Sequence, residues 1–450
     1  MRGRVTLILA TVLVLCLVGA GIAVWRLEQV TPTLSNVNIG PEASARAQRA
    51  SALAAHPPTK GLGAPASTRP DKVERRSLTK AEPGADMPGG ADGLVTTVSI
   101  TTPAFTIAQR FRSMEGPYAD YTTRLDGAAT DAGVGRELWW WKGAKIELFD
   151  ADDHPVGQEF MCHLNIDVDG ESRRSVLGRR PDARRLLTLT QGELSFALPK
   201  GVGVPAASDE IWSTMFQVLN HNRDGEFHIK QRLTLYFVRD VDLFSPIEPA
   251  SWQAASIWVS VDKSSPDAIA SDKIACHCCL PLTRGLEATN NVALGRTVDA
   301  AGRVLVGHWT VPPAKSTWAY PVRLGEKFPA KDQKLYATWT HLHPFATEAR
   351  LSAHKPGCAP AIIARSEIES LRDGKVGLVK IKSFASPEGV PLPEGAIYEL
   401  AVDYDNSSGR AQDSMTSLGM FVSDDTWTRP EWASRAQNTS GMDGSCGTGP

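Results

Sequence analysis

Short runs of alternating apolar and polar residues, each bounded by turn-forming residues, recur from about residue 95 onward. Examples are residues 95–100, 145–149, 186–190 and 233–238. A period of two places successive side chains on opposite faces of a strand, and short strands with frequent turns are typical of antiparallel sandwiches. Helical periodicity is hard to find after the N-terminus, and 38 Gly and 30 Pro are compatible with a strand-rich chain. The sequence therefore predicts an all-β body.

The N-terminus has the pattern of a targeting segment. An apolar run over residues 5–25 follows Arg2 and Arg4 and ends at Arg26. About twenty apolar residues can span a bilayer, and the positive-inside rule leaves the two leading arginines in the cytoplasm. We expect residues 1–26 to be a transmembrane signal-anchor that holds the folded body outside the cytoplasm, periplasmic or extracellular. The alternative is a cleaved segment and a secreted protein.

Composition divides the rest of the chain. Residues 27–93 are rich in Ala, Pro, Gly, Ser and Thr and have few large apolar residues, which predicts a disordered linker. Residues 94–247 and 248–430 are the expected N-terminal and C-terminal β-sandwich domains, and 431–450 a flexible tail. The net charge of −2 gives no indication of a nucleic-acid partner. The oligomeric state stays open.

Six of the seven cysteines lie outside the apolar run, and an even number in an exported chain suggests disulfides. The dense sequence Cys276-His277-Cys278-Cys279 resembles a metal site at first reading. Zinc motifs, however, usually offer two spaced pairs of ligands. We therefore interpret this segment as disulfide ends beside a loop, with their connectivity undefined.

The pattern with the clearest chemistry is His341-Leu342-His343 at the end of a strand-like run. Residues i and i+2 of a strand share a face, so the two imidazoles would project side by side. A second strand-like run over residues 413–421 carries Met415. Two imidazoles and a thioether form a soft site that favours copper cycling through Cu(I). Met420 would face the opposite side of that run, because it lies an odd number of residues away.

Two strand-like segments of the first half also carry histidine, His163 beside Cys162 and His221 after Leu219. Together with the turn-rich segment 198–205, the sequence Val-Pro-Pro at 311–313 and the pattern Asp413-x-Met415, their order resembles the copper type II, ascorbate-dependent monooxygenases. This is the family of peptidylglycine α-hydroxylating monooxygenase and dopamine β-monooxygenase. The resemblance covers roughly residues 115 to 430.

The resemblance implies two tandem antiparallel, jelly-roll-like β-sandwiches, each holding one copper across a cleft. It assigns His341, His343 and Met415 to the second-domain copper, and ascorbate or another one-electron reductant to the reaction. The family's first-domain His-His pair appears here as Cys162-His163.

The first-domain copper site is therefore degraded. The family's strand histidine falls on Leu219, and His221 lies two residues further on the same face. The remaining first-domain ligands would be His163 and His221, while Cys162 would be either a thiolate ligand or half of a disulfide. We expect one copper, with two as the alternative.

The family's carboxylate-gripping Arg and Tyr correspond to Trp339 and Gly419 here, which excludes a glycine-extended peptide as substrate. Trp339 would instead offer an apolar substrate-binding surface beside the copper. The expected function is hydroxylation of a C–H bond of a small-molecule or secreted substrate with O2, with no catalytic residue beyond the metal ligands. The alternative is a membrane-anchored, non-catalytic copper-binding or surface-interaction protein.

Overall fold

The computed structural model describes residues 75–80, 92–111, 116–125, 136–179, 183–262, 296–298, 301–322, 332–372 and 374–433. All of them belong to one compact unit, His56–Pro450. The expected anchor, most of the expected linker and residues 434–450 lie outside the described residues. Within the described ranges, no helix has the length and apolarity that a membrane crossing requires.

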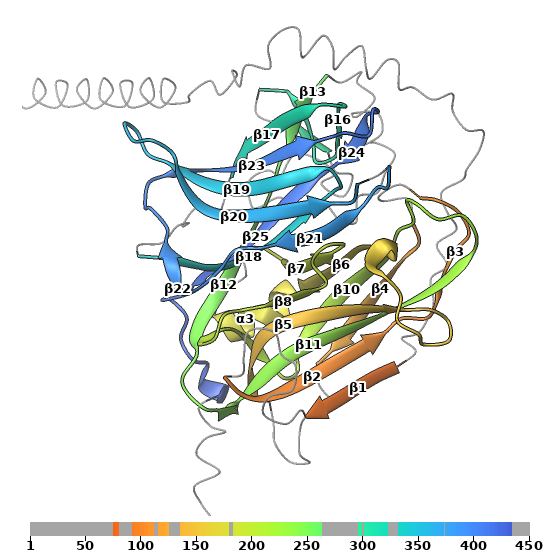
Figure 1. Ribbon diagram of the computed structural model, residues 1–450. Helices are drawn as coiled ribbons and strands as arrows, with labels where there is room; N and C mark the ends of the chain where they lie inside the picture. Colours follow the sequence, from red (N-terminus) through yellow and green to blue (C-terminus); the bar gives the residue numbers. More distant parts are fainter. Residues whose placement is uncertain are drawn as a thin grey trace, which may run out of the picture. The chain divides into compact units, whose positions relative to one another are not determined.

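The first half of the described chain forms two sheets (Figure 1). The larger has the order β1-β2-β11-β5-β9, with β3 beside β11 and β8 beside β5, and the smaller has the order β4-β10-β6-β7. The strands are β1 (Arg75–Lys80), β2 (Gly93–Thr101), β3 (Phe105–Ile107), β4 (Tyr118–Arg124), β5 (Leu138–Phe149), β6 (Met161–Val168), β7 (Arg185–Thr190), β8 (Ser195–Ala197), β9 (Val202–Ala207), β10 (Ile211–Val218) and β11 (Phe227–Leu243).

The second half contributes the orders β12-β25-β18-β22 and β17-β23-β19-β20-β21, with the smaller sheets β13-β15-β14 and β16-β24. Its strands are β12 (Glu248–Ser256), β13 (Val259–Val261), β14 (Arg296–Val298), β15 (Val304–Val306), β16 (Trp309–Val311), β17 (Lys315–Pro321), β18 (Lys334–Leu342), β19 (Ala346–His354), β20 (Ala361–Ser370), β21 (Leu378–Lys382), β22 (Ala385–Pro391), β23 (Ile397–Asp405), β24 (Gln412–Ser414) and β25 (Thr416–Ser423).

The predicted all-β class is confirmed. Helix in the described residues amounts to α3 (Gly170–Leu177), the 3₁₀ turn η1 (Gln158–Phe160) and a last turn at 431–433. The prediction that all of residues 27–93 are a disordered linker is wrong for Arg75–Lys80, which forms β1 and pairs with β2. A sheet edge offers unpaired backbone groups, so a segment of mostly polar residues can still add a strand there.

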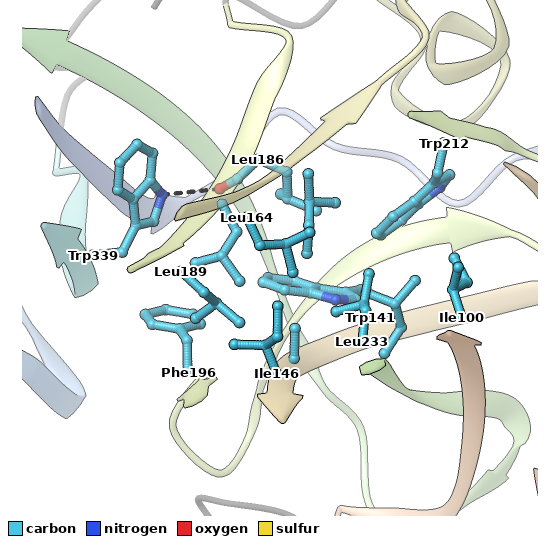
Figure 2. Packing of buried hydrophobic residues seen from close by; sticks show 14 of the residues in the cluster. Ile100, Trp141, Ile146, Leu164, Leu186, Leu189, Phe196, Trp212, Leu233 and Trp339 are labelled. Carbon is cyan, nitrogen blue, oxygen red and sulfur yellow. Dashed lines mark hydrogen bonds between the residues drawn. The ribbon is translucent and has the colours of Figure 1, made fainter. Parts of the chain in front are cut away.

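Strand β5 shows how period two builds the first core. Trp139 and Trp141 face the main cluster of buried side chains, while Trp140 faces a smaller cluster on the other side. Figure 2 shows Trp141 among buried aliphatic and aromatic residues of several strands, with Trp212 across the core. The Trp141 and Trp212 ring centroids are 6.4 Å apart.

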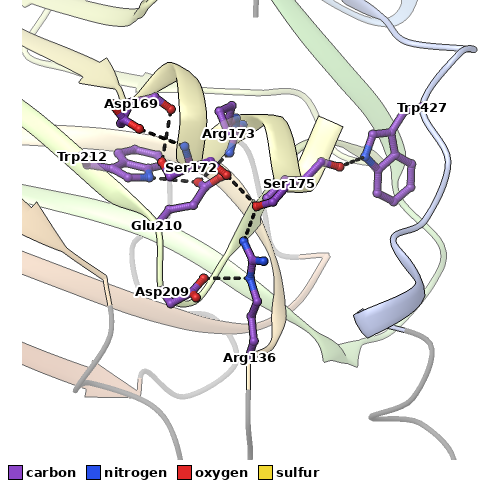
Figure 3. A network of polar contacts seen from close by, with 10 residues as sticks. Arg136, Asp169, Ser172, Arg173, Ser175, Asp209, Glu210, Trp212 and Trp427 are labelled. Carbon is purple, nitrogen blue, oxygen red and sulfur yellow. Dashed lines mark hydrogen bonds and ion pairs between the residues drawn. The ribbon is translucent and has the colours of Figure 1, made fainter. Parts of the chain in front are cut away.

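A buried ion pair fixes α3 against this core. Arg173 donates to Glu210 at 2.7 Å, and Trp212 donates to the same carboxyl at 3.1 Å. Trp427 donates to the Val176 carbonyl at 3.0 Å, which ties the chain after β25 to the helix (Figure 3). These buried charges therefore have structural partners, as a buried ion pair requires.

The sheet β12-β25-β18 separates two cores and is called here the shared wall. Trp252, Trp339 and Phe421 from its three strands belong to the first core, whereas Leu418 and Met420 belong to the second. Short parallel pairing of β9 with β12, Val202 with Glu248, joins the wall to the larger sheet of the first half. One sheet path thus runs through both halves, and the boundary expected near residue 248 falls at this joint.

Candidate metal centre

His341 lies near the end of β18, opposite Ser417 of β25. It shares a strand face with Trp339, and that face packs against β7 of the first half. The His341 Nδ1 lies 3.1 Å from the Thr190 Oγ1 of β7. The side chain is buried, and its Nε2 has no hydrogen-bond partner among the described residues.

His343 follows the last residue of β18 and lies beside His341, with ring centroids 5.7 Å apart. The strand period therefore brings the two imidazoles together, as the sequence predicted. Both are almost fully buried, at 2% and 3% exposure. The His343 Nδ1 lies 2.9 Å from the Oδ2 of Asp413, so a carboxylate approaches the pair from another sheet.

Asp413 comes from β24, which pairs with β16. Thr310 is opposite Asp413, so His308, just before β16, is a diagonal cross-strand neighbour of the carboxylate. The His308 Nδ1 lies 3.8 Å from the Asp413 Oδ1, and the His308 and His343 ring centroids are 5.5 Å apart. One ligand atom from each of the three residues lies within 4.8 Å of the others.

The charges of this group depend on one another. Partial burial alone would raise the pKa of Asp413, but interactions with His343 and His308 hold that pKa well below its usual range. Burial, reinforced by His163 and His343, lowers the pKa of His341 far below that of a free imidazole. Asp413 is thus held as a carboxylate and His341 as a neutral imidazole, the protonation states in which these two groups bind metals.

His163 and His221 both approach this centre from the first half. The His163 ring lies against that of His341, with centroids 5.3 Å apart. Burial, together with the charge of His343, lowers the pKa of His221 to about 4, which places His221 in the field of the same group. This differs from the expected arrangement of two separate clusters, because β18 of the shared wall packs directly against β7.

Cys162 lies beside His163, with its Sγ 3.3 Å from the His163 Nδ1. No disulfide joins Cys162 to Cys358, the other described cysteine. The choice between a thiolate ligand and a disulfide half for Cys162 stays a prediction. Cys276, Cys278, Cys279 and Cys446 lie outside the described residues.

Met415 is buried between β24 and β25, at 1% exposure. Coordination by its sulfur stays a prediction. Met420 lies in the second core, on the opposite face of the wall from Trp339, which agrees with the expected packing role.

Trp339 is the residue that the structure places differently. Its side chain is 1% exposed, and its Nε1 donates to the Leu186 carbonyl at 3.0 Å (Figure 2). The wall face that carries it is covered by the first half of the chain. The predicted substrate surface at Trp339 is therefore a buried contact between the halves.

The donors fit a transition metal. Imidazole suits copper, iron, nickel and zinc, and a carboxylate adds an oxygen ligand and a negative charge.

A second cluster of possible metal ligands, formed by Asp150, Asp152 and His154, also has ligand atoms close together. Asp150 there accepts bonds from the backbone N–H groups of Asp152 and His154, which is a turn structure on the surface.

Sequence reasoning missed His308 and used Asp413 only as part of a motif. A single histidine before a three-residue strand carries no periodic signal. Only the pairing of β16 with β24, which joins segments far apart in the chain, reveals that His308 and Asp413 share one site.

No family model and no curated protein matches this chain. Among solved structures, it is similar to the major capsid protein P2 of bacteriophage PM2, at 8% identity over 79% of this chain and 100% of that one, with a TM-score of 0.24. It is also similar to PNGF-II, at 9% identity over 78% and 65%, with a TM-score of 0.21. An archaeal virus protein with a triple jelly-roll fold shows 9% identity over 73% and 59%, with a TM-score of 0.16. Scores this low carry no argument about function.

Proposed function

We propose that this chain is a copper-dependent, monooxygenase-like protein that hydroxylates a C–H bond of a small-molecule or secreted substrate with O2. The observation that carries the proposal is the meeting of His343, from the predicted His-x-His pair, with His308 and Asp413 within ligand distance of one another. Copper bound there would supply the one-electron chemistry that oxygen activation needs, with ascorbate or another one-electron reductant as electron donor.

One side of the centre is buried and the other is exposed to solvent. His341 and His343 are buried, whereas the Asp413 side chain is 40% exposed and that of His308 14%. O2 and substrate would therefore reach the metal from the Asp413 side. The face against β7 excludes water and holds the imidazoles in place through the contact between His341 and Thr190.

A non-catalytic metal-binding protein is the second candidate. The observation that favours it is the close packing of His163 on His341 and of Trp339 on β7, which turns the predicted substrate residue Trp339 into a buried contact. Copper-loaded protein freed of unbound metal separates the two candidates. Reductant-dependent oxygen uptake that disappears in His343→Ala supports the enzyme, and its absence in the wild type supports the binding protein.

The proposed cellular setting follows from the N-terminal apolar run. A single span over residues 5–25 would anchor the body outside the cytoplasm. In a surface-exposed orientation, protease added to intact cells should remove the body. Survival of the body while a known surface control is cut would exclude that orientation.

The metal count tests the proposed site. Wild-type protein should retain about one copper per chain after removal of loose metal, and His343→Ala should retain less than about a tenth of that. His354→Ala is the matched control, because this histidine lies on β19 of the same half and, among the described residues, has its ion-pair contact with Glu399, at 3.7 Å. Equal retention by His343→Ala and the wild type would contradict the proposal.

A further inference from the structure

We propose that the first ligands of the metal are His308, His343 and Asp413, two imidazoles and one carboxylate, and that the centre therefore prefers a divalent ion over Cu(I). This inference rests on the proposed function, since it concerns the metal at the same site. It replaces the thioether expected from Met415 with an oxygen donor, and it adds a histidine that no sequence pattern indicated.

The argument for the carboxylate is geometric. The two oxygens of Asp413 face different imidazoles, Oδ2 toward His343 at 2.9 Å and Oδ1 toward His308 at 3.8 Å. Three ligand atoms that lie this close together can share one ion at ordinary metal–ligand distances of about 2.0–2.2 Å. The His343 Nδ1 and the Asp413 oxygens therefore surround a common point without rearrangement of β16, β24 or the end of β18.

The argument for His308 comes from the two sheets that meet here. His308 and Asp413 are placed by the β16–β24 pair, while His343 is placed by β18 of the shared wall. A ligand set drawn from two independent sheets would be held by the second core on which both pack. Trp309, next to His308, and Leu342, next to His343, are both buried in that core.

The donor set decides which ion is preferred. Thioether and thiolate select reduced copper, whereas two imidazoles and a carboxylate with open positions suit divalent ions, including Fe(II) and Zn(II). A negative oxygen donor also stabilises the higher charge of Cu(II) relative to Cu(I). The buried Nε2 of His341 lies in the ring beside His343 and is available as a further nitrogen donor.

A simpler role for Asp413 must be distinguished from ligation. A carboxylate that accepts a hydrogen bond from the Nδ1–H of a metal-bound histidine only orients the ring, and its loss costs about 10- to 100-fold in metal affinity. Removal of a charged ligand should cost more. The variants Asp413→Asn and Met415→Leu separate ligation, orientation and the thioether alternative, because each retains the shape of the side chain.

The experiment measures the affinities of the full-length protein for Cu(II), Zn(II), Fe(II) under anaerobic conditions, and Cu(I). We expect Asp413→Asn to weaken the three divalent ions more than 100-fold, His308→Gln to weaken them at least tenfold, and Met415→Leu to change every affinity less than threefold. Asp405→Asn is the control, because this exposed carboxylate pairs with Lys315 in the part of the chain that the structure describes, away from the proposed ligands. Near-native circular dichroism of each variant verifies folding.

Three results would overturn the ligand assignment. They are a loss below 100-fold in Asp413→Asn, unchanged binding in His308→Gln, and a selective loss of Cu(I) in Met415→Leu. In each of these cases metal still binds the wild-type protein, so the proposed function survives. Absence of any metal binding by the wild type would refute the proposed function itself.

Discussion

Glu193 is a single residue that makes the stability of the contact between the two halves depend on pH. Its carboxyl is buried in the turn between β7 and β8, and the Ser383 hydroxyl of the second half donates to it at 2.9 Å. Burial raises the pKa of Glu193 to about 8, despite the opposing effect of hydrogen bonds. Burial therefore favours the protonated form of Glu193 near neutral pH, against the hydrogen bond that Ser383 donates.

The stability of the fold should fall as pH rises through this range. The folded pKa is raised above the unfolded value near 4.5, so between pH 4.5 and 8 the folded state binds more protons than the unfolded state. Glu193→Gln, which mimics the protonated group, should gain stability over the wild type by up to about 1.4 kcal/mol per pH unit from pH 5 to 8. Denaturant unfolding at several pH values measures this gain. Parallel curves for the two proteins would show that Glu193 does not titrate as described.

For individual residues, the sequence predicted contacts within one strand and missed contacts between segments that are far apart in the chain. The adjacency of His341 and His343 follows from period two within one strand, and the structure has it. The approach of His308 to Asp413 depends on which strands pair, and no local pattern contains that information. The prediction of Trp339 as a substrate-binding residue is wrong for the same reason, because its hydrogen-bond partner Leu186 lies in the other half of the chain.

Among the elements, the contact between β18 and β25 depends on a glycine. Trp339 is opposite Gly419 in the pairing of the two strands. A methyl group added at Gly419 would lie 1.9 Å from the Trp339 Nε1, so the indole occupies the space that a side chain would fill. The shared wall therefore accommodates its tryptophan only because the facing residue has no Cβ.

Gly419→Ala should destabilise the protein by about 1–3 kcal/mol, the usual range for an overpacked interior. Trp339→Ala should cost about 3–5 kcal/mol through the cavity that it leaves. Since the two residues touch, the double variant should be less destabilised than the sum of the two. Gly170→Ala is the control, because nothing lies within 4 Å of its added methyl group. Strict additivity in a thermodynamic cycle from denaturant unfolding would contradict this contact.

For the whole molecule, the class of fold followed from strand patterning, but the relation between the halves did not. The resemblance implied two sandwiches that face each other across a cleft. Instead, Trp252, Trp339 and Phe421 of the second half complete the core of the first, and one sheet path joins both. A wall that serves two cores needs apolar residues on both faces, and neither periodicity nor composition tells which domain covers each face.

The packed junction brings His163 and His341 into one cluster with the metal centre. Among the described residues, this single cluster fits the proposal of one metal position better than that of two separated ones. That position lies where the wall, the β16–β24 pair and the first half meet, with Asp413 toward solvent.

The most direct test is an anomalous-difference map collected at the copper edge from crystals of the copper-loaded protein. The account predicts a single peak per chain, bounded by His308, His343 and Asp413. A peak at the Met415 sulfur without Asp413 would contradict the ligand assignment. Peaks confined to other parts of the chain, or no peak at all in crystals that contain copper, would contradict the proposed centre.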